Sequence, residues 1–93
     1  MIYQWDPGKA KANLNKHNVS FDEAIAVFLD PFALTFDDPD HSSDEQRFVT
    51  IGTSSTGRII FVAHADSGED NVRIISARSA TSTEAYAYQE SRK

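Results

Sequence analysis

The chain has 93 residues, which is enough for one small domain and too few for two, because domains usually hold roughly 100 residues or more. It contains no cysteine, which excludes disulfide bridges and thiolate metal sites and fits a reducing cytoplasm. Ten aromatic residues, six Phe, three Tyr and one Trp, argue against disorder, and no apolar run approaches the roughly 20 residues of a membrane-spanning helix. We therefore expect one soluble cytoplasmic domain, residues 1–93, with no membrane partner.

The net charge of −5 is unevenly distributed along the sequence. Five of the fourteen acidic residues lie in one stretch: Asp37, Asp38, Asp40, Asp44 and Glu45. The nine that remain equal the nine Lys and Arg in number, so the rest of the chain is close to neutral. The overall charge argues against indiscriminate binding to nucleic acids, but this distribution still allows a local cationic pocket.

The N-terminal part of the chain predicts a short strand followed by a helix. Residues 2–5 alternate in the manner of a strand. Asp6 followed by Pro7 is typical of a helix N-terminus, and this first helix should end near Asn18.

A second helix should follow directly. Ser20 and Glu23 match the S-x-x-E capping box, and the pair Asp30-Pro31 should end the helix. The acidic stretch at 37–45 has turn formers and charge but no periodicity, so we expect it to be a solvated loop.

The remainder of the chain predicts a sheet and a last helix. Runs rich in strand formers indicate four strands, at residues 32–36, 47–53, 58–65 and 71–77. The last three are joined by connections short enough for an antiparallel meander. Thr81 and Glu84 form a capping box that starts the C-terminal helix. The predicted order is β-α-α-β-β-β-β-α, an α+β domain whose small antiparallel sheet has its helices on one face.

The strand at 71–77 raises the question of what its arginines do. A guanidinium in a half-buried strand costs free energy unless it is paired, reaches water or binds an anionic ligand. Strand alternation places Arg58 and His64 on one side of their strand. It places Arg73 on one side of the next strand, with Arg78 just past the strand end. If the face that carries these groups has no helices, it is a cationic binding surface.

Ion pairing is the alternative for two of these arginines. Glu84 of the last helix could pair with Arg73 or Arg78 and fix the position of that helix. Likewise, His17 is better explained by an interaction with the dipole of the first helix than by catalysis.

No metal or nucleotide site is indicated. The acidic stretch lacks the Gly and the closing Glu of an EF-hand loop, and the three histidines lack a metal-binding spacing. The sequence contains neither a Walker loop nor a Gly-rich dinucleotide turn. We therefore expect no metal and no cofactor.

Several motifs resemble one known family over nearly the whole chain. They are "WDPGKAKANLNKHNVSFDEA" from residue 5, "DPDHSSDEQRFVTIG" from residue 38, "GRIIFVAH" from residue 57 and "VRIISARSAT" from residue 72. Together they resemble the BrnT ribonuclease toxins of bacterial toxin-antitoxin pairs. The resemblance implies a RelE-like fold, which is compatible with the predicted element order.

The resemblance implies a metal-independent endoribonuclease, which activates the ribose 2′-OH against the neighbouring phosphate. Such cleavage needs fixed donors for the charge that develops on the phosphate oxygens, and a group that moves protons. Guanidinium groups suit the first task and imidazole the second. The candidate catalytic residues are Arg58, His64, Arg73, Arg78 and Lys16. The candidate RNA-binding residues are Lys9, Arg47 and Phe48, of which Phe48 could stack a base.

The resemblance also implies a partner. In this family a cognate antitoxin binds and silences the toxin, and the complex represses the promoter DNA of the pair, so we expect a hetero-oligomer whose substrate is RNA. The alternative is a toxin-fold interaction module that has lost cleavage and acts with an antitoxin only in transcriptional autoregulation. Two features favour this alternative: the negative net charge of the chain, and the segment "HADS" at 64–67, which differs from that of many relatives. The arginines favour the enzyme.

Overall fold

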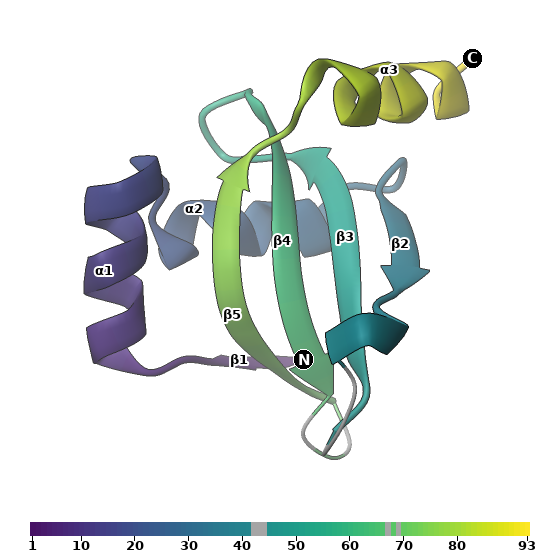
Figure 1. Cartoon of the computed structure of the whole chain (residues 1–93). Helices are drawn as coiled ribbons and strands as arrows, with labels where there is room; N and C mark the ends of the chain where they lie inside the picture. The colour runs from purple at the N-terminus through teal and green to yellow at the C-terminus, as the bar shows by residue number, and fades with distance from the viewer. Residues whose placement is uncertain (42–44, 67, 69) are drawn as a thin grey trace.

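The structure, a computed structural model, describes residues 1–41, 45–66, 68 and 70–93. It contains one five-stranded sheet with three α-helices and two short 3-10 helices (Figure 1). In chain order the elements are β1 (Ile2–Gln4), α1 (Pro7–His17), α2 (Phe21–Ile25), η1 (Ala26–Leu29), β2 (Leu34–Asp37), η2 (Pro39–His41), β3 (Arg47–Thr53), β4 (Ile59–Asp66), β5 (Asn71–Ser79) and α3 (Ser82–Ser91). The predicted α+β class and element order are confirmed. Residues 42–44 of the predicted acidic loop and Ser67 of "HADS" lie outside the described residues.

The strands are arranged in the order β1-β5-β4-β3-β2. β3 to β5 pair as an antiparallel meander, as predicted, and β2 adds to it antiparallel with β3. β1 pairs in parallel with β5 at the edge of the sheet, so the sheet is mixed and not wholly antiparallel as expected. In Figure 1, α2 lies behind the sheet, α1 stands beside β5, and α3 lies across the end of the sheet near the ends of β3 and β5. The face of the sheet toward the viewer is therefore largely open.

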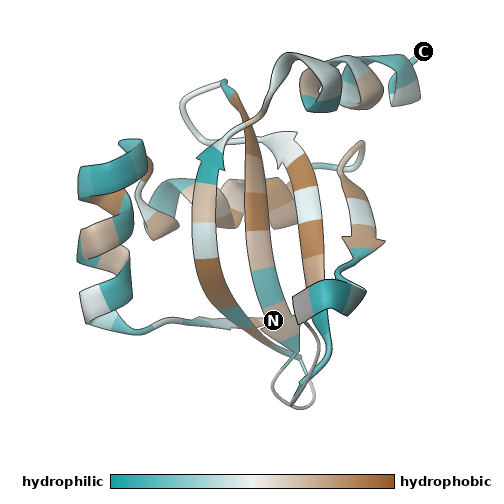
Figure 2. Ribbon diagram, in the orientation of Figure 1, coloured by the Kyte–Doolittle hydropathy of each residue, from teal (hydrophilic) through white to brown (hydrophobic). Residues whose placement is uncertain are grey.

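The core lies between the sheet and the helices of the N-terminal half. Val19, Phe21, Ala24 and Val27 pack there against Ile60, Val62, Ile74 and Ala77. Figure 2 shows that β3, β4 and β5 all carry hydrophobic residues, and those of β4 and β5 include the four strand residues of this layer. Full burial of each large apolar side chain contributes about 1.5–3 kcal/mol, so this layer provides much of the stability.

The helix caps follow the sequence prediction with one difference. The carboxylate of Asp6 accepts hydrogen bonds from the backbone of α1, and Thr81 and Glu84 form a complete capping box at α3. At α2, Ser20 accepts from the backbone N–H of Glu23, but the Glu23 carboxylate binds Arg58 instead of closing the box. The capping box predicted at the start of α2 is therefore only half formed.

The amide of Asn13 joins α1 to β5. Its Nδ2 donates to the carbonyl oxygens of Val19 and Ala77 at 2.9 and 2.8 Å, and its Oδ1 accepts from the backbone N–H of Ala77 at 3.0 Å. β1 pairs with β5 only at residues 71–73. Asn13 thus satisfies the backbone of β5 where no strand pairs with that edge, and it fixes the position of α1 beside the open face.

A β-bulge changes the direction of the side chains along β5. Ile74 pairs with His64 and Ser76 with Ala63, so Ile75 is an extra residue with no partner opposite it. Arg73 and Arg78 therefore point to the same face, although regular alternation would place residues five apart on opposite faces. The prediction that Arg78 lies past the strand end was wrong, because β5 continues to Ser79.

Candidate functional site

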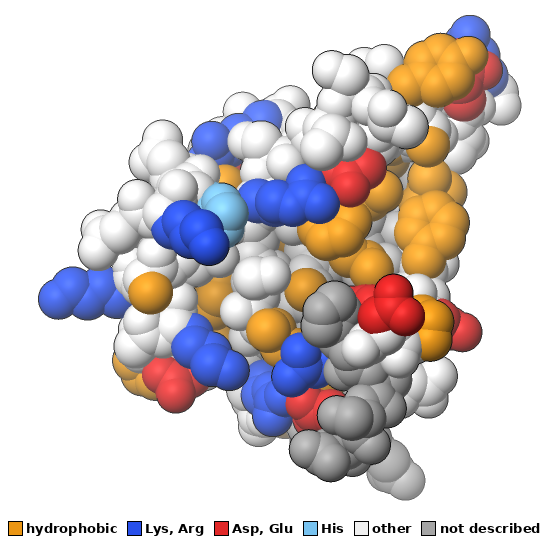
Figure 3. All heavy atoms as spheres, viewed as in Figure 1, with side chains coloured by type: hydrophobic (Ala, Val, Ile, Leu, Met, Phe, Trp, Pro, Cys, Tyr) orange, Lys and Arg blue, Asp and Glu red, His pale blue; other side chains and the backbone are white. Residues whose placement is uncertain are grey.

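Two adjoining hollows form a groove on the open face of the sheet. The first, of about 340 Å³, is lined by Asp38, Arg47, Val49, Phe61, Ala63, Ile75 and Ser76. The second, of about 220 Å³, is lined by Lys9, Ala12, Asn13, Lys16, His17, Ile75 and Ser76. Because both are lined by Ile75 and Ser76, they lie next to each other, and we call the two together the open groove. Figure 3 shows Lys and Arg side chains around this face, with apolar side chains between them.

α1 supplies one cationic wall of the open groove. Lys9 and Lys16 are about two helical turns apart and therefore share a face of the helix. His17 lies next to Lys16 and lines the same hollow. Asn13, on the same face, fixes this side of α1 against β5. The helix is thus held so that its basic face borders the groove.

A pair of arginines lies at another part of this face, around one carboxylate. Arg73 Nη2 donates to Glu45 Oε1, and Arg47 Nε lies 3.7 Å from the same oxygen. The three side chains are partly exposed, with 39% of Arg73, 31% of Arg47 and 28% of Glu45 accessible to solvent. The two guanidinium groups therefore converge on one point at the surface.

Arg78 lies on the open face but is firmly paired. Its guanidinium donates two hydrogen bonds to the carboxylate of Glu84, at 2.8 and 3.0 Å, and lies 3.9 Å from the ring centre of Phe61. Arg78 is the main reason that the pKa of Glu84 is lowered, and Glu84 also accepts from the backbone of Thr81. The alternative suggested by the sequence is confirmed for Arg78: it fixes α3. Arg73 pairs with Glu45 instead.

Arg58 binds on the side of the sheet that the helices cover. Its Nε and Nη2 each donate to the carboxylate of Glu23 at 2.7 Å, and Nη2 also donates to the backbone of Asn18. Ser54 and Thr56 donate to the same carboxylate. These bonds, led by that of Arg58, lower the pKa of Glu23 from 4.5 to about 2. The expected placement of Arg58 on an uncovered face was wrong, and its contacts are structural.

His64 is buried on the same covered side. Its ring lies near Phe28 and Phe48, with centroid distances of 4.9 and 5.8 Å, and its Nε2 is 2.7 Å from Thr50 Oγ1. Burial lowers the pKa of His64, so the ring is held neutral. The expectation that His64 lies with Arg58 on an open face was wrong. Phe48 also lies on the covered side, where its ring stacks on that of His64 and is not exposed for an RNA base.

Five of the eight candidate residues therefore lie on the open face, and three lie beneath the sheet. Those on the open face are Lys9, Lys16, Arg47, Arg73 and Arg78; those beneath it are Arg58, His64 and Phe48. Sequence reasoning missed the floor of the groove, Val49, Phe61, Ala63 and Ser76. Alternation along β3 and β4 groups the first three on one side, which is a signal that could have found them.

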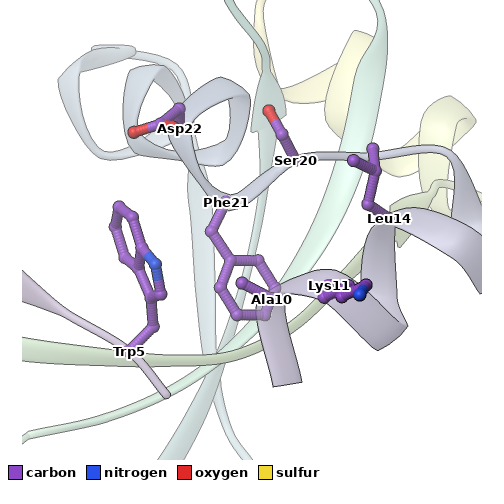
Figure 4. Close-up of a pocket in the computed structure, with 7 residues that line it drawn as sticks. All are labelled: Trp5, Ala10, Lys11, Leu14, Ser20, Phe21 and Asp22. Atoms are coloured by element: carbon purple, nitrogen blue, oxygen red, sulfur yellow. The ribbon is translucent and has the colours of Figure 1, made fainter. Parts of the chain in front are cut away.

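A further hollow of about 260 Å³ lies on another side of α1 (Figure 4). Its lining is mainly apolar, with Trp5 and Phe21 in edge-to-face contact and Lys11 and Asp22 also bordering it. Among the described residues no cluster of three or more His, Asp or Glu side chains is arranged to hold a metal ion. Within the same residues, no helix is both long and apolar enough to cross a membrane.

The chain matches one protein-family model and is similar to a solved structure. Residues 5–84 match the family model described as the ribonuclease toxin BrnT of a type II toxin-antitoxin system. The crystal structure of the Brucella abortus ribonuclease toxin BrnT is similar to the chain with a TM-score of 0.69 and 30% sequence identity, over 87% of this chain and 99% of that one. No curated protein matches the sequence.

Proposed function

Since the chain belongs to the BrnT family of ribonuclease toxins of type II toxin-antitoxin systems, we propose that it is a metal-independent endoribonuclease that binds RNA in the open groove. One observation carries this proposal. Lys9, Lys16, Arg47 and Arg73 all lie on the one face of the sheet that carries the groove, although the whole chain has a net charge of −5. Such a local excess of positive charge suits a polyanion.

The lining of the groove favours single-stranded RNA. Val49, Phe61 and Ala63 give the floor an apolar surface, whereas the cations lie around it. Phosphates of a bound strand would contact the cations, and unpaired bases would face the floor. A duplex keeps its bases inside and gains nothing from an apolar floor.

The reaction that fits these groups is an internal transfer at phosphorus. The ribose 2′-oxygen attacks the adjacent phosphorus, the bond from phosphorus to the 5′-oxygen breaks, and the products are a 2′,3′-cyclic phosphate and a free 5′-hydroxyl. A base must take the 2′ proton, an acid must protonate the 5′-oxygen, and cations must stabilise the charged phosphorane.

His17 and Lys16 are our candidates for these tasks. His17 is the histidine that lines the groove, and imidazole can accept and donate protons near neutral pH. Lys16 beside it supplies a positive charge for the phosphorane oxygens. Arg47 and Arg73 would hold flanking phosphates. Arg78 contributes to the field of the site, but two of its N–H donors already bind Glu84.

A cognate antitoxin is the partner that the family implies. We propose that it inhibits the toxin by covering the open groove in the cytoplasm, and that the resulting complex binds the promoter DNA of the pair. The groove is accessible from solvent along the open face, so a partner need not unfold the domain to block it.

The products of the reaction provide the test. The purified chain, incubated with single-stranded RNA and EDTA, should yield fragments with 2′,3′-cyclic phosphate and 5′-hydroxyl ends. The double substitution Lys16→Ala and His17→Ala should abolish cleavage without changing the fold. Lys11→Ala is the matched control, because Lys11 is on the same helix but lines a different hollow. Cleavage that stops with EDTA, or that leaves 5′-phosphate ends, would contradict the metal-independent mechanism.

The second candidate, an inactive interaction module, is favoured by one specific observation. All four candidate arginines are close to carboxylates: Arg58 to Glu23, Arg78 to Glu84, and both Arg47 and Arg73 to Glu45. If this function is correct, the folded chain leaves RNA intact under all conditions but still binds the antitoxin. Induction of the chain alone in bacteria separates the two candidates, because only the enzyme arrests growth.

A further inference from the structure

The carboxylate of Glu45 occupies the point where two arginines converge on the open face. We propose that Arg47 and Arg73 form a phosphate subsite, that Glu45 is its resident occupant in the free protein, and that RNA binds by displacing Glu45. This inference rests on the proposed RNA-binding function of the groove. It makes Glu45 a residue that lowers the affinity of the toxin for its substrate.

The geometry around Glu45 is that of an anion site. Arg73 Nη2 donates to Oε1 of Glu45, and Arg47 Nε is 3.7 Å from the same atom. Carboxylate and phosphate oxygens accept from the same guanidinium donors, so a phosphate oxygen can take the position of Oε1. Arg47 also lines the open groove, which connects this point to the rest of the proposed RNA path.

The three glutamates that pair with arginines differ in how firmly they are held. Glu23 is 9% exposed, and Arg58, Ser54 and Thr56 all donate to it. Glu84 belongs to α3, where its carboxylate also caps the helix backbone at Thr81. In both cases, loss of the pair would disturb an element of the fold.

Glu45 lies outside the helices and strands, between η2 and β3, and 28% of its side chain is exposed. It meets both arginines through one oxygen, Oε1. Displacement of Glu45 therefore breaks a solvent-screened contact and leaves the packing of the core intact. Of the three, this is the carboxylate that a ligand can replace at low cost.

The size of the effect follows from the strength of such contacts. Exposed ion pairs of this kind change an equilibrium constant by roughly 1.4- to 5-fold. Because Glu45 faces two guanidinium groups, we expect the substitution Glu45→Gln to tighten RNA binding by about two- to fivefold. Gln keeps the shape of the side chain but removes the charge that competes with phosphate.

The test measures binding to a single-stranded 2′-O-methyl oligoribonucleotide, which cannot be cleaved because the attacking hydroxyl is blocked. Fluorescence anisotropy gives Kd for the wild type and for Glu45→Gln. Glu90→Gln is the matched control: it makes the same change in net charge, but Glu90 pairs with Lys93 at the end of α3. Only Glu45→Gln should tighten binding by the expected factor, and the gain should shrink when Arg73 is first changed to Gln.

The outcomes separate this inference from the proposed function. Suppose that the wild type binds and cuts RNA but Glu45→Gln binds no more tightly than Glu90→Gln. In that case the displacement model is wrong and the nuclease assignment stands. If neither the wild type nor Glu45→Gln binds the oligonucleotide at low salt, both the inference and the RNA-binding function are rejected.

Discussion

Removal of Arg58 should destabilise the fold rather than impair catalysis alone. The pKa of Glu23 falls from 4.5 to about 2 in the folded chain, and 2.5 pKa units at 1.36 kcal/mol each correspond to about 3 kcal/mol of stability at neutral pH. Arg58 is the largest cause of this shift, but 36% of its side chain is exposed, so solvent screens part of the interaction. We expect Arg58→Ala to lower the free energy of unfolding by about 2 kcal/mol, because it leaves a buried carboxylate unpaired.

Urea unfolding followed by circular dichroism, repeated between pH 2 and 7, measures this effect. Between pH 2 and 4.5 the unfolded chain binds a proton at Glu23 that the folded chain does not, so stability should rise with pH across this window. In Arg58→Ala the rise should be smaller, because the folded pKa moves back toward 4.5. Lys93→Ala, which removes an exposed pair at the C-terminus, is the control.

The opposite result would refute this reasoning. If Arg58→Ala unfolds at the same urea concentration as the wild type at pH 7, and RNA cleavage is nevertheless lost, Arg58 acts in catalysis. Its contacts with Glu23 would then be incidental to stability.

Three further predictions concern the groups around the groove and the core. Burial lowers the pKa of His64, so the stability of the folded chain should fall as the pH drops through about 6.5, where the imidazole of the unfolded chain takes up a proton. Thermal melts between about pH 5 and 7 should show a smaller dependence on pH for His64→Gln. Asn13→Ala should cost about 2–3 kcal/mol and speed hydrogen exchange at the amide of Ala77, and unchanged exchange there would argue against the link between α1 and β5. Arg78→Ala should loosen α3 and lower the free energy of unfolding by about 1 kcal/mol, with faster exchange in α3 but not in α1.

Local sequence signals predicted the elements well. Asp6 with Pro7, Ser20, and Thr81 with Glu84 marked the three α-helix starts, because a cap is a local hydrogen bond between residues a few positions apart. The strands were found within about two residues of their ends, which is the usual uncertainty. The parallel pairing of β1 with β5 was not predicted, because a pairing between residues as far apart as 2 and 71 produces no pattern in the local sequence.

The candidate site was predicted only in part, for reasons that lie in tertiary structure. Alternation grouped Arg58 with His64 correctly, but it could not say which face the helices would cover. The Glu23 carboxylate could accept hydrogen bonds either from the N-terminus of its own helix or from Arg58, and in the structure it binds Arg58, which is distant in sequence. The resemblance of the motifs to the BrnT toxins identified the correct family. The contacts of Glu45 with Arg47 and Arg73 could be found only from the three-dimensional structure.

The extra residue at Ile75 has a consequence for the divergence of such proteins. Loss of one residue between Arg73 and Arg78 would restore regular alternation and still leave both arginines on the same side, because their separation would become even. A shift of the strand by one position without such a deletion would instead turn Arg78 inward and bring the fully buried Ala77 to the surface. Natural length variants in this strand should therefore preserve the shared orientation of the two guanidinium groups, even where the spacing between them differs.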